Sequence, residues 1–182
     1  MGYAVTMDIL PSPLPHNLTV FTTSDTHGET VSYEIAELAA SGPVAVLDGG
    51  NCFPGYRVLR LLWGRVPDPA EAAGRVFVQR ASTCYQVLSL LESTPALPRP
   101  HVLLDPFATF YDEQIALPEV RRLLEGCLRQ VERLRQAAPL LAVTPPARSA
   151  ERLFLVERLC LAADALYELE ALPAPASQPA LF

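Results

Sequence analysis

The sequence predicts an α/β domain with a mostly parallel central sheet flanked by helices, on the strength of three observations. Short apolar segments alternate with amphipathic segments of helical length along most of the chain. Most of the apolar segments are nearly uninterrupted, as expected for strands that are covered on both faces. The chain has 182 residues, of which 50% are hydrophobic, which is enough for one compact domain with a sizeable core.

Six short apolar segments are expected to be strands, and the first five are the runs predicted to be covered on both faces. They are 17–22, 43–48, 75–79, 101–106, 139–144 and 164–170. The amphipathic segments between them are expected to be helices. They are 31–41, 55–64, 83–93, 117–138 and 149–163.

The longest predicted helix, 117–138, carries apolar residues at helical spacing and charged residues on its other side. The apolar residues are Val120, Leu123, Leu124, Cys127, Leu128, Val131 and Leu134. On the charged side we expect arginines that are solvated or paired with Glu125 and Glu132. They are Arg122, Arg129 and Arg133.

The chain ends in a Pro/Ala-rich segment that cannot bury much apolar surface. We therefore expect a core over residues 1–171 and a flexible tail over 172–182. No apolar run approaches the roughly 18 residues that span a bilayer, and the first residues lack the pattern of a signal peptide. These features predict a cytoplasmic protein.

The net charge and the spacing of the cysteines argue against some classes of function. The net charge is −6, and all 14 basic residues are arginine, so autonomous DNA binding is not expected unless the arginines cluster. The four cysteines lie more than thirty residues apart, which favours buried thiols over a zinc site or a disulfide framework. They are Cys52, Cys84, Cys127 and Cys160.

The segment 21–32 allows two interpretations. In the first, Asp25 and His27 open the two-metal site of a metal-dependent phosphoesterase. Such a site needs several histidines and carboxylates from successive strand ends, and the chain offers only His16 and His101 besides. Since neither is expected at the end of a strand, this interpretation is the weaker alternative.

In the second interpretation, residues 23–30 form a P-loop between a strand and a helix, where G-x-x-x-x-G-K-[ST] must lie to bind phosphates. Thr23 stands in place of the first glycine and Gly28 keeps the second. Glu29 replaces the lysine, and Thr30 keeps the hydroxyl. Two of the four positions match.

The order and spacing of the downstream segments support the second interpretation. A predicted strand ends in an aspartate, a second is followed by Arg-Ala, and "HVLLD" has the form of a Walker B strand. The residues concerned are Asp48, Phe53, Arg57, Arg80, Ala81, Gln86 and Asp105. Over about residues 17–170, this pattern resembles the ATPase core of the RecA/RadA recombinase family, which implies a RecA-like P-loop fold.

The resemblance also implies that the ATPase chemistry is lost. Glu29 would place a carboxylate against the nucleotide phosphates, where like charges about 4 Å apart repel by roughly 4 kcal/mol. Gly50 stands where the family has its water-activating glutamate, and Asp105 with Thr30 would hold Mg²⁺ only weakly. We therefore expect no ATP or Mg²⁺ cofactor. The degenerate pocket comprises Thr23, Gly28, Glu29, Thr30, Asp48, Gly50, Gln86 and Asp105.

The family's two DNA-contacting loops correspond to residues 107–119 and 144–151. The first carries Asp112, Glu113 and Glu119 and no arginine, and the second carries only Arg148. The resemblance therefore implies little autonomous DNA binding and a non-catalytic subunit or scaffold in a repair or recombination complex. Its expected partner is another RecA-like protein or a recombination mediator.

Two alternatives remain: an ATPase subunit with an altered or shared site, and a structural partner outside DNA metabolism. The end of the chain, "QPALF", also resembles the Gln-x-x-Leu-Phe peptide that docks bacterial repair proteins on the sliding clamp. In that role, Leu181 and Phe182 would fill an apolar pocket and Gln178 would hydrogen-bond at its rim.

Overall fold

The computed structural model describes residues 18–26 and 28–169, and its centre is one sheet of six parallel strands in the order β3-β2-β4-β5-β1-β6. The strands are β1 (Leu18–Thr23), β2 (Val44–Asp48), β3 (Val76–Arg80), β4 (His101–Leu104), β5 (Leu140–Thr144) and β6 (Ala165–Leu169). The structure therefore confirms all six predicted strands and the parallel α/β class.

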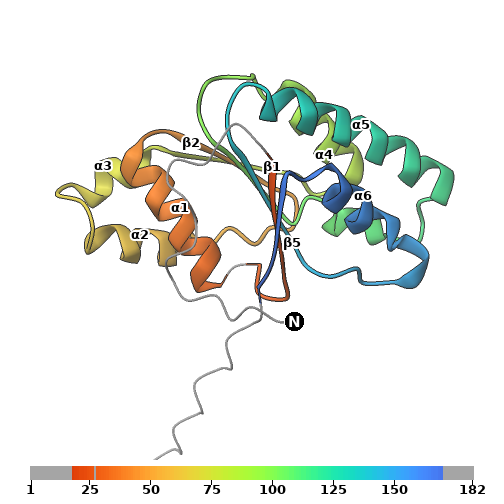
Figure 1. The fold of residues 1–182 in the computed structure, drawn as a ribbon, viewed down its shortest axis with the longest axis horizontal. Helices are drawn as coiled ribbons and strands as arrows, with labels where there is room; N and C mark the ends of the chain where they lie inside the picture. The colour runs from red at the N-terminus through yellow and green to blue at the C-terminus, as the bar shows by residue number, and fades with distance from the viewer. Residues whose placement is uncertain (1–17, 27, 170–182) are drawn as a thin grey trace, which may run out of the picture.

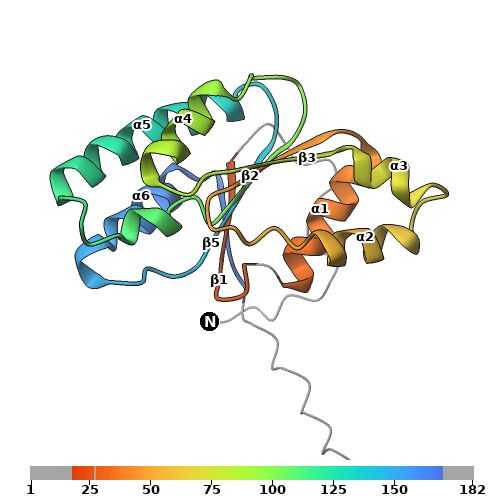
Figure 2. The same cartoon turned by 180° about the vertical axis from the view of Figure 1, so that it is seen from behind.

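Helices cover both faces of this sheet (Figures 1 and 2). On one face lie α1 (Glu29–Ser41), α2 (Gly55–Trp63) and α3 (Pro69–Gly74), and on the other lie α4 (Cys84–Ser93), α5 (Leu117–Arg135) and α6 (Phe154–Ala162). Two short 3₁₀ helices follow β4 and β5, at Ala108–Tyr111 and Ala150–Arg152. The five predicted helices are confirmed, and α3 is an addition.

Helix α3, which was not predicted, begins with an N-cap residue, Asp68. The Asp68 carboxylate accepts a hydrogen bond from the Glu71 backbone N–H at 2.9 Å, and Pro69 occupies the first helical turn. Both residues are typical of helix N-termini, because such positions leave backbone N–H groups to be satisfied and suit the fixed φ of proline.

Two hydrophobic cores result from the alternation of side chains along each strand. Val46 of β2 packs with Ile35 and Leu62 on the α1–α3 face, whereas Leu47 packs with Leu124 and Leu155 on the α4–α6 face. The covered strands β2, β4 and β5 are buried along their whole length, which explains their uninterrupted apolar sequences.

Strand β3 is an exception to the prediction that the first five strands are covered on both faces. It lies at an edge of the sheet and pairs with β2 alone. The Phe77 side chain is 49% exposed, and Gln79 is exposed as well. The prediction was wrong here because β3 is an edge strand, and a short apolar run does not distinguish an edge strand from one that is covered on both faces.

Two further expectations need correction. On α5, Arg122 and Arg129 are exposed, as expected, but Arg122 pairs with Glu119 and not with Glu125 or Glu132. Arg133 is half-buried and donates hydrogen bonds to the carbonyls of Leu91 and Thr94. Glu125 and Glu132 pair with Arg158 and Arg135. Among the cysteines, Cys84 and Cys127 are buried as expected, but Cys52 and Cys160 are only half-buried.

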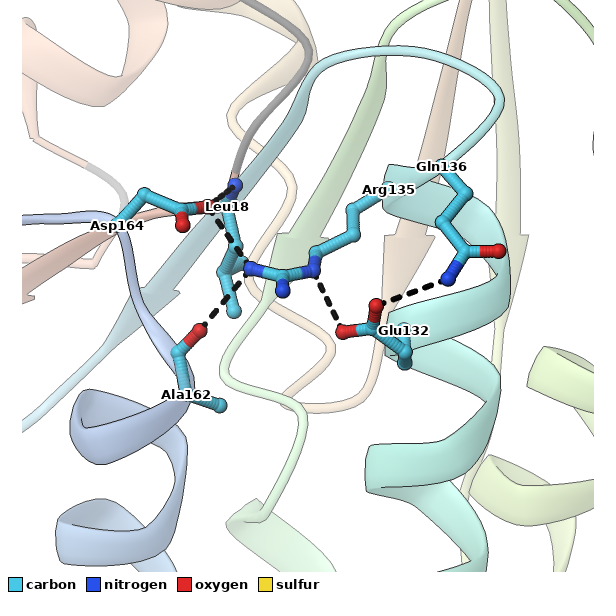
Figure 3. A network of polar contacts seen from close by, with 6 residues as sticks. All are labelled: Leu18, Glu132, Arg135, Gln136, Ala162 and Asp164. Atoms are coloured by element: carbon cyan, nitrogen blue, oxygen red, sulfur yellow. Dashed lines mark hydrogen bonds and ion pairs between the residues drawn. The ribbon is translucent and has the colours of Figure 1, made fainter.

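The amino edge of the sheet, where the strands begin, is tied together by Arg135 at the end of α5 (Figure 3). Its guanidinium contacts the Asp164 carboxylate at 2.8 Å and the Glu132 carboxylate at 2.6 Å. Asp164 also accepts a hydrogen bond from the Leu18 N–H at 2.8 Å. The network thus connects α5 to the starts of β1 and β6.

None of the helices within residues 18–26 and 28–169 has the length and apolar character to cross a membrane.

Candidate functional site at the carboxyl edge of the sheet

In an open parallel sheet, ligands bind beyond the carboxyl ends of the strands. The strand registers bring four of these ends together: Asp48 of β2 pairs with Leu104 of β4, and Leu104 pairs with Val143 of β5. Strand β1 lies beside β5 and ends at the same level. The polar and charged residues at the ends of β1, β2, β4 and β5 are therefore neighbours.

Asp48 is a fully buried carboxylate that organises the turn after β2. It accepts hydrogen bonds from the backbone N–H groups of Cys52 at 2.9 Å and Phe53 at 3.0 Å, and from Arg80 Nε at 3.3 Å. Asn51, within the same turn, has a positive φ of 52°. These contacts give Asp48 a loop-capping role, and they satisfy both of its oxygens.

Asp105 follows β4 and is 4% exposed. Its Oδ2 accepts a charge-assisted hydrogen bond from Arg148 Nη2 at 2.5 Å. Burial raises the pKa of Asp105 above its ordinary value, Arg148 opposes that rise, and nearby Asp48 adds to it. The φ of Asp105 is 41°, a conformation that aspartate tolerates better than most residues. The carboxylate at the predicted Walker B position is therefore occupied by an arginine of the same chain.

Gly50 packs directly against Asp105. A Cβ at position 50 would lie 2.7 Å from the Asp105 Cβ and 2.9 Å from its Oδ2. Any residue other than glycine would have to displace the Asp105 side chain. The position that the resemblance assigns to a water-activating glutamate therefore has no room for one in this arrangement.

Acidic groups flank the start of α1. A Cβ on Gly28 would overlap the Asp25 carboxylate and lie 2.6 Å from its Cγ, so this carboxylate rests against the first residues of the helix. Glu29 is exposed in the first turn. Negative charge is favourable at a helix N-terminus, and here the chain supplies it with its own side chains. A bound phosphate would meet two carboxylates.

The remaining P-loop positions hold the local backbone. Thr23 is buried, and its Oγ1 accepts a hydrogen bond from the Asp25 N–H at 3.1 Å, while Thr30 is exposed. Thr26 is buried and its hydroxyl lies beside the Cys52 thiol. Burial, reinforced by Asp48, raises the pKa of Cys52 to about 12, which leaves this thiol a poor nucleophile.

The other candidate residues lie apart from this group. Gln86 is exposed and helps to cap α4: its Oε1 accepts from the Ser82 N–H at 2.8 Å, and its own N–H donates to Thr83 Oγ1 at 3.2 Å. His101 begins β4 and is therefore at the opposite end of that strand from Asp105. His16, His27 and the clamp-like residues Gln178, Leu181 and Phe182 lie outside the described residues.

Arg152 is a structural residue that the sequence did not reveal. It is 5% exposed and donates hydrogen bonds to the backbone carbonyls of Phe110, Asp112 and Ile115. It thereby holds the loop after β4, which carries the exposed Asp112 and Glu113, against the start of α6. No sequence signal predicts it, because its acceptors are carbonyls about forty positions away.

A comparison with solved structures shows which known fold this chain shares. A solved structure described as the RadB recombinase is similar over 89% of this chain and 78% of that chain, with a TM-score of 0.61 and 18% sequence identity. The chain has a RecA-like α/β fold. The similarity confirms the resemblance inferred from the sequence at the level of the fold. No protein-family profile matches the sequence, and no curated protein matches it.

Proposed function

We propose that this RecA-like chain is a non-catalytic subunit, or scaffold, of a DNA repair or recombination complex. The observation that carries the proposal is the contact of Asp105 with Arg148 and with the turn at Gly50. In a RecA-like ATPase, the equivalent carboxylate would help to hold Mg²⁺ and the equivalent turn would supply a general base. Here the same space holds an internal ion pair and a glycine.

Electrostatics at the start of α1 support the same conclusion. Nucleotide phosphates are normally held by backbone N–H groups and a lysine. In this chain the Asp25 carboxylate lies against Gly28, and Glu29 occupies the lysine position. A triphosphate would have to displace one carboxylate and lie beside another.

As a scaffold, the chain would act through a partner, and we propose another RecA-like protein or a recombination mediator. Direct DNA binding is disfavoured because the loop after β4 exposes Asp112 and Glu113, and because Arg148 of the loop after β5 is already paired with Asp105. The clamp-like peptide formed by Gln178, Leu181 and Phe182 stays a prediction.

Calorimetric titration of the full chain with Mg²⁺-ATP tests the lost nucleotide site. We expect a dissociation constant above about 1 mM, because Glu29 stands where the lysine of a P-loop would face the phosphates. Glu29→Lys should tighten binding about tenfold or more, since it removes one repulsive charge and adds an attractive one. Glu92→Lys, an equal charge change at the end of α4 on the other face of the sheet, is the matched control and should leave ATP affinity unchanged.

Micromolar binding of ATP by the unmodified chain would contradict the proposal and favour an ATPase subunit with an altered or shared site. Equal effects of the Glu29→Lys and Glu92→Lys variants would show that net charge, and not the position at α1, governs affinity.

A further inference from the structure

Helix α2 has an outward face that nothing in the carboxyl-edge site uses. Val58 and Leu62 are buried against the sheet, whereas Tyr56 is 79% exposed and Trp63 is 72% exposed. Arg60, which is also exposed, lies between the two rings at spacings of four and three residues. Residues at such spacings share one side of a helix, so Tyr56, Arg60 and Trp63 form a single stripe, here called the α2 face.

The composition of the α2 face is that of an interface centre. Large aromatic side chains are costly to leave in water, and an exposed pair of them calls for an explanation. Tyrosine, tryptophan and arginine are also the residue types that most often carry the binding energy of protein interfaces. The α2 face combines all three within two turns of helix.

Its charge indicates what kind of partner it would take. The chain has a net charge of −6, yet residues 49–67 include three arginines and no carboxylate. The nearest helices do not neutralise Arg60: Glu37 of α1 pairs with Arg65 at 2.8 Å, and Glu71 of α3 pairs with Arg75 at 2.7 Å. Across residues 18–26 and 28–169, no hydrogen bond or ion pair engages the Arg60 side chain.

We propose that the α2 face docks an acidic amphipathic helix of a partner protein. Apolar side chains of that helix would pack on the Tyr56 and Trp63 rings, and its carboxylates would flank Arg60. The proposal rests on the proposed scaffold function, which it deepens by naming the face that receives the partner. In Figures 1 and 2, α2 lies among α1 and α3, on the sheet face opposite α4–α6, so the partner would approach from that side.

A single-stranded nucleic acid fits the α2 face less well. Tyr56 and Trp63 are seven positions apart, which sets them about 10 Å apart along the helix axis. Single-strand binders instead stack successive bases along a positively charged groove. A helix partner, with apolar residues one and two turns apart, matches a spacing of this size.

Trp63 is the only tryptophan of the chain, so its fluorescence reports directly on this face. The full chain would be titrated with three probes: an 18-residue amphipathic helix with a leucine stripe and glutamates, the same peptide with lysines for glutamates, and an oligo-dT of twenty nucleotides. We expect only the acidic peptide to shift Trp63 emission to the blue and to protect it from acrylamide quenching.

Variants identify the residues responsible. Arg60→Glu and Tyr56→Ala should each weaken binding of the acidic peptide about tenfold. The matched controls are Arg129→Glu, on an exposed position of α5, and Tyr85→Ala, an exposed aromatic of α4, and both should leave the affinity unchanged. Circular dichroism establishes that each variant keeps its fold.

An absent fluorescence response to the acidic peptide, an equal response to the lysine peptide, or a response to oligo-dT alone would each overturn the proposal. These outcomes are separate from those of the nucleotide titration. If the chain binds ATP tightly and also binds the acidic peptide, the scaffold proposal is wrong and the docking proposal for the α2 face stands.

Discussion

The two edges of the sheet are both held by arginine–carboxylate contacts, but the surroundings of these contacts differ. At the carboxyl edge, Asp48 and Asp105 are almost completely buried, and one arginine reaches each of them from the surface. At the amino edge, the Arg135 network of Figure 3 uses Glu132 and Asp164, whose side chains are 48% and 45% exposed. Similar pairs therefore have different consequences when they are broken.

The difference follows from solvation. A buried carboxylate that loses its cation stays behind as an uncompensated charge, which costs about 3–5 kcal/mol. An exposed carboxylate that loses its cation is rehydrated, so exposed pairs contribute about 0–1 kcal/mol. The carboxyl edge is thus expected to be sensitive to single substitutions, and the amino edge to be tolerant.

The largest effect is expected from Arg148→Ala. This substitution leaves Asp105 buried without its cation and should lower the free energy of unfolding by about 3 kcal/mol near neutral pH, less than the maximum because Arg148 itself is half-exposed. Urea denaturation followed by circular dichroism measures the loss.

A second substitution isolates the charge of Asp105. Asp105→Asn in the Arg148→Ala background removes the buried charge and should recover most of the lost stability. If the double variant is as unstable as Arg148→Ala, the loss reflects the packing of the Arg148 side chain against its surroundings, and the comparison between the two edges fails.

The sequence predicted the sheet, five of the helices and the positions of Asp48 and Asp105, because strand periodicity and strand ends are local signals. It did not predict that Arg148 reaches Asp105, since the loops after β4 and β5 meet only in the folded sheet. The tight packing of Gly50 on Asp105 was equally hidden, although Gly50 was singled out as a departure from the family pattern. Glu29 and Gly28 lie at the start of α1, as the P-loop pattern required.

Gln86 shows a second reason why the site could not be predicted correctly from the sequence. The family pattern grouped it with the nucleotide site, whereas its amide caps α4 together with Thr83. Thr83 followed three residues later by Gln86 is a capping sequence in its own right. The local signal was present in the sequence and was read as part of a functional motif.

Protonation of His101 at the amino edge and of Asp105 at the carboxyl edge should change the free energy of unfolding in opposite directions. His101, at the amino edge, is fully buried, and burial lowers its pKa below the ordinary value of 6.5, with Arg99 and Arg133 adding to the effect. The unfolded chain then binds the proton more readily, so stability falls as pH drops below 6.5. The raised pKa of Asp105 has the opposite sign: its contribution falls as pH rises above the ordinary value of 3.8.

His101→Phe separates these contributions. Between pH 7 and pH 5 the variant should lose less stability than the unmodified chain, by no more than about 2 kcal/mol, the limit set by the ordinary histidine pKa. Chemical denaturation at half-unit pH intervals gives the two curves. Parallel curves over this range would mean that His101 is protonated equally in the folded and unfolded chain.

The smallest effect is expected from Arg135→Ala at the amino edge. Asp164 would keep its hydrogen bond from the Leu18 N–H, and Glu132 would be rehydrated, so we expect a loss of about 1 kcal/mol. The loss should shrink in about 0.5 M salt, because salt screens exposed charges. Arg122→Ala, which breaks the exposed pair with Glu119 within α5, is the control and should cost less than Arg135→Ala. A loss as large as that of Arg148→Ala would show that the amino edge, despite its exposure, is as dependent on its arginine as the carboxyl edge.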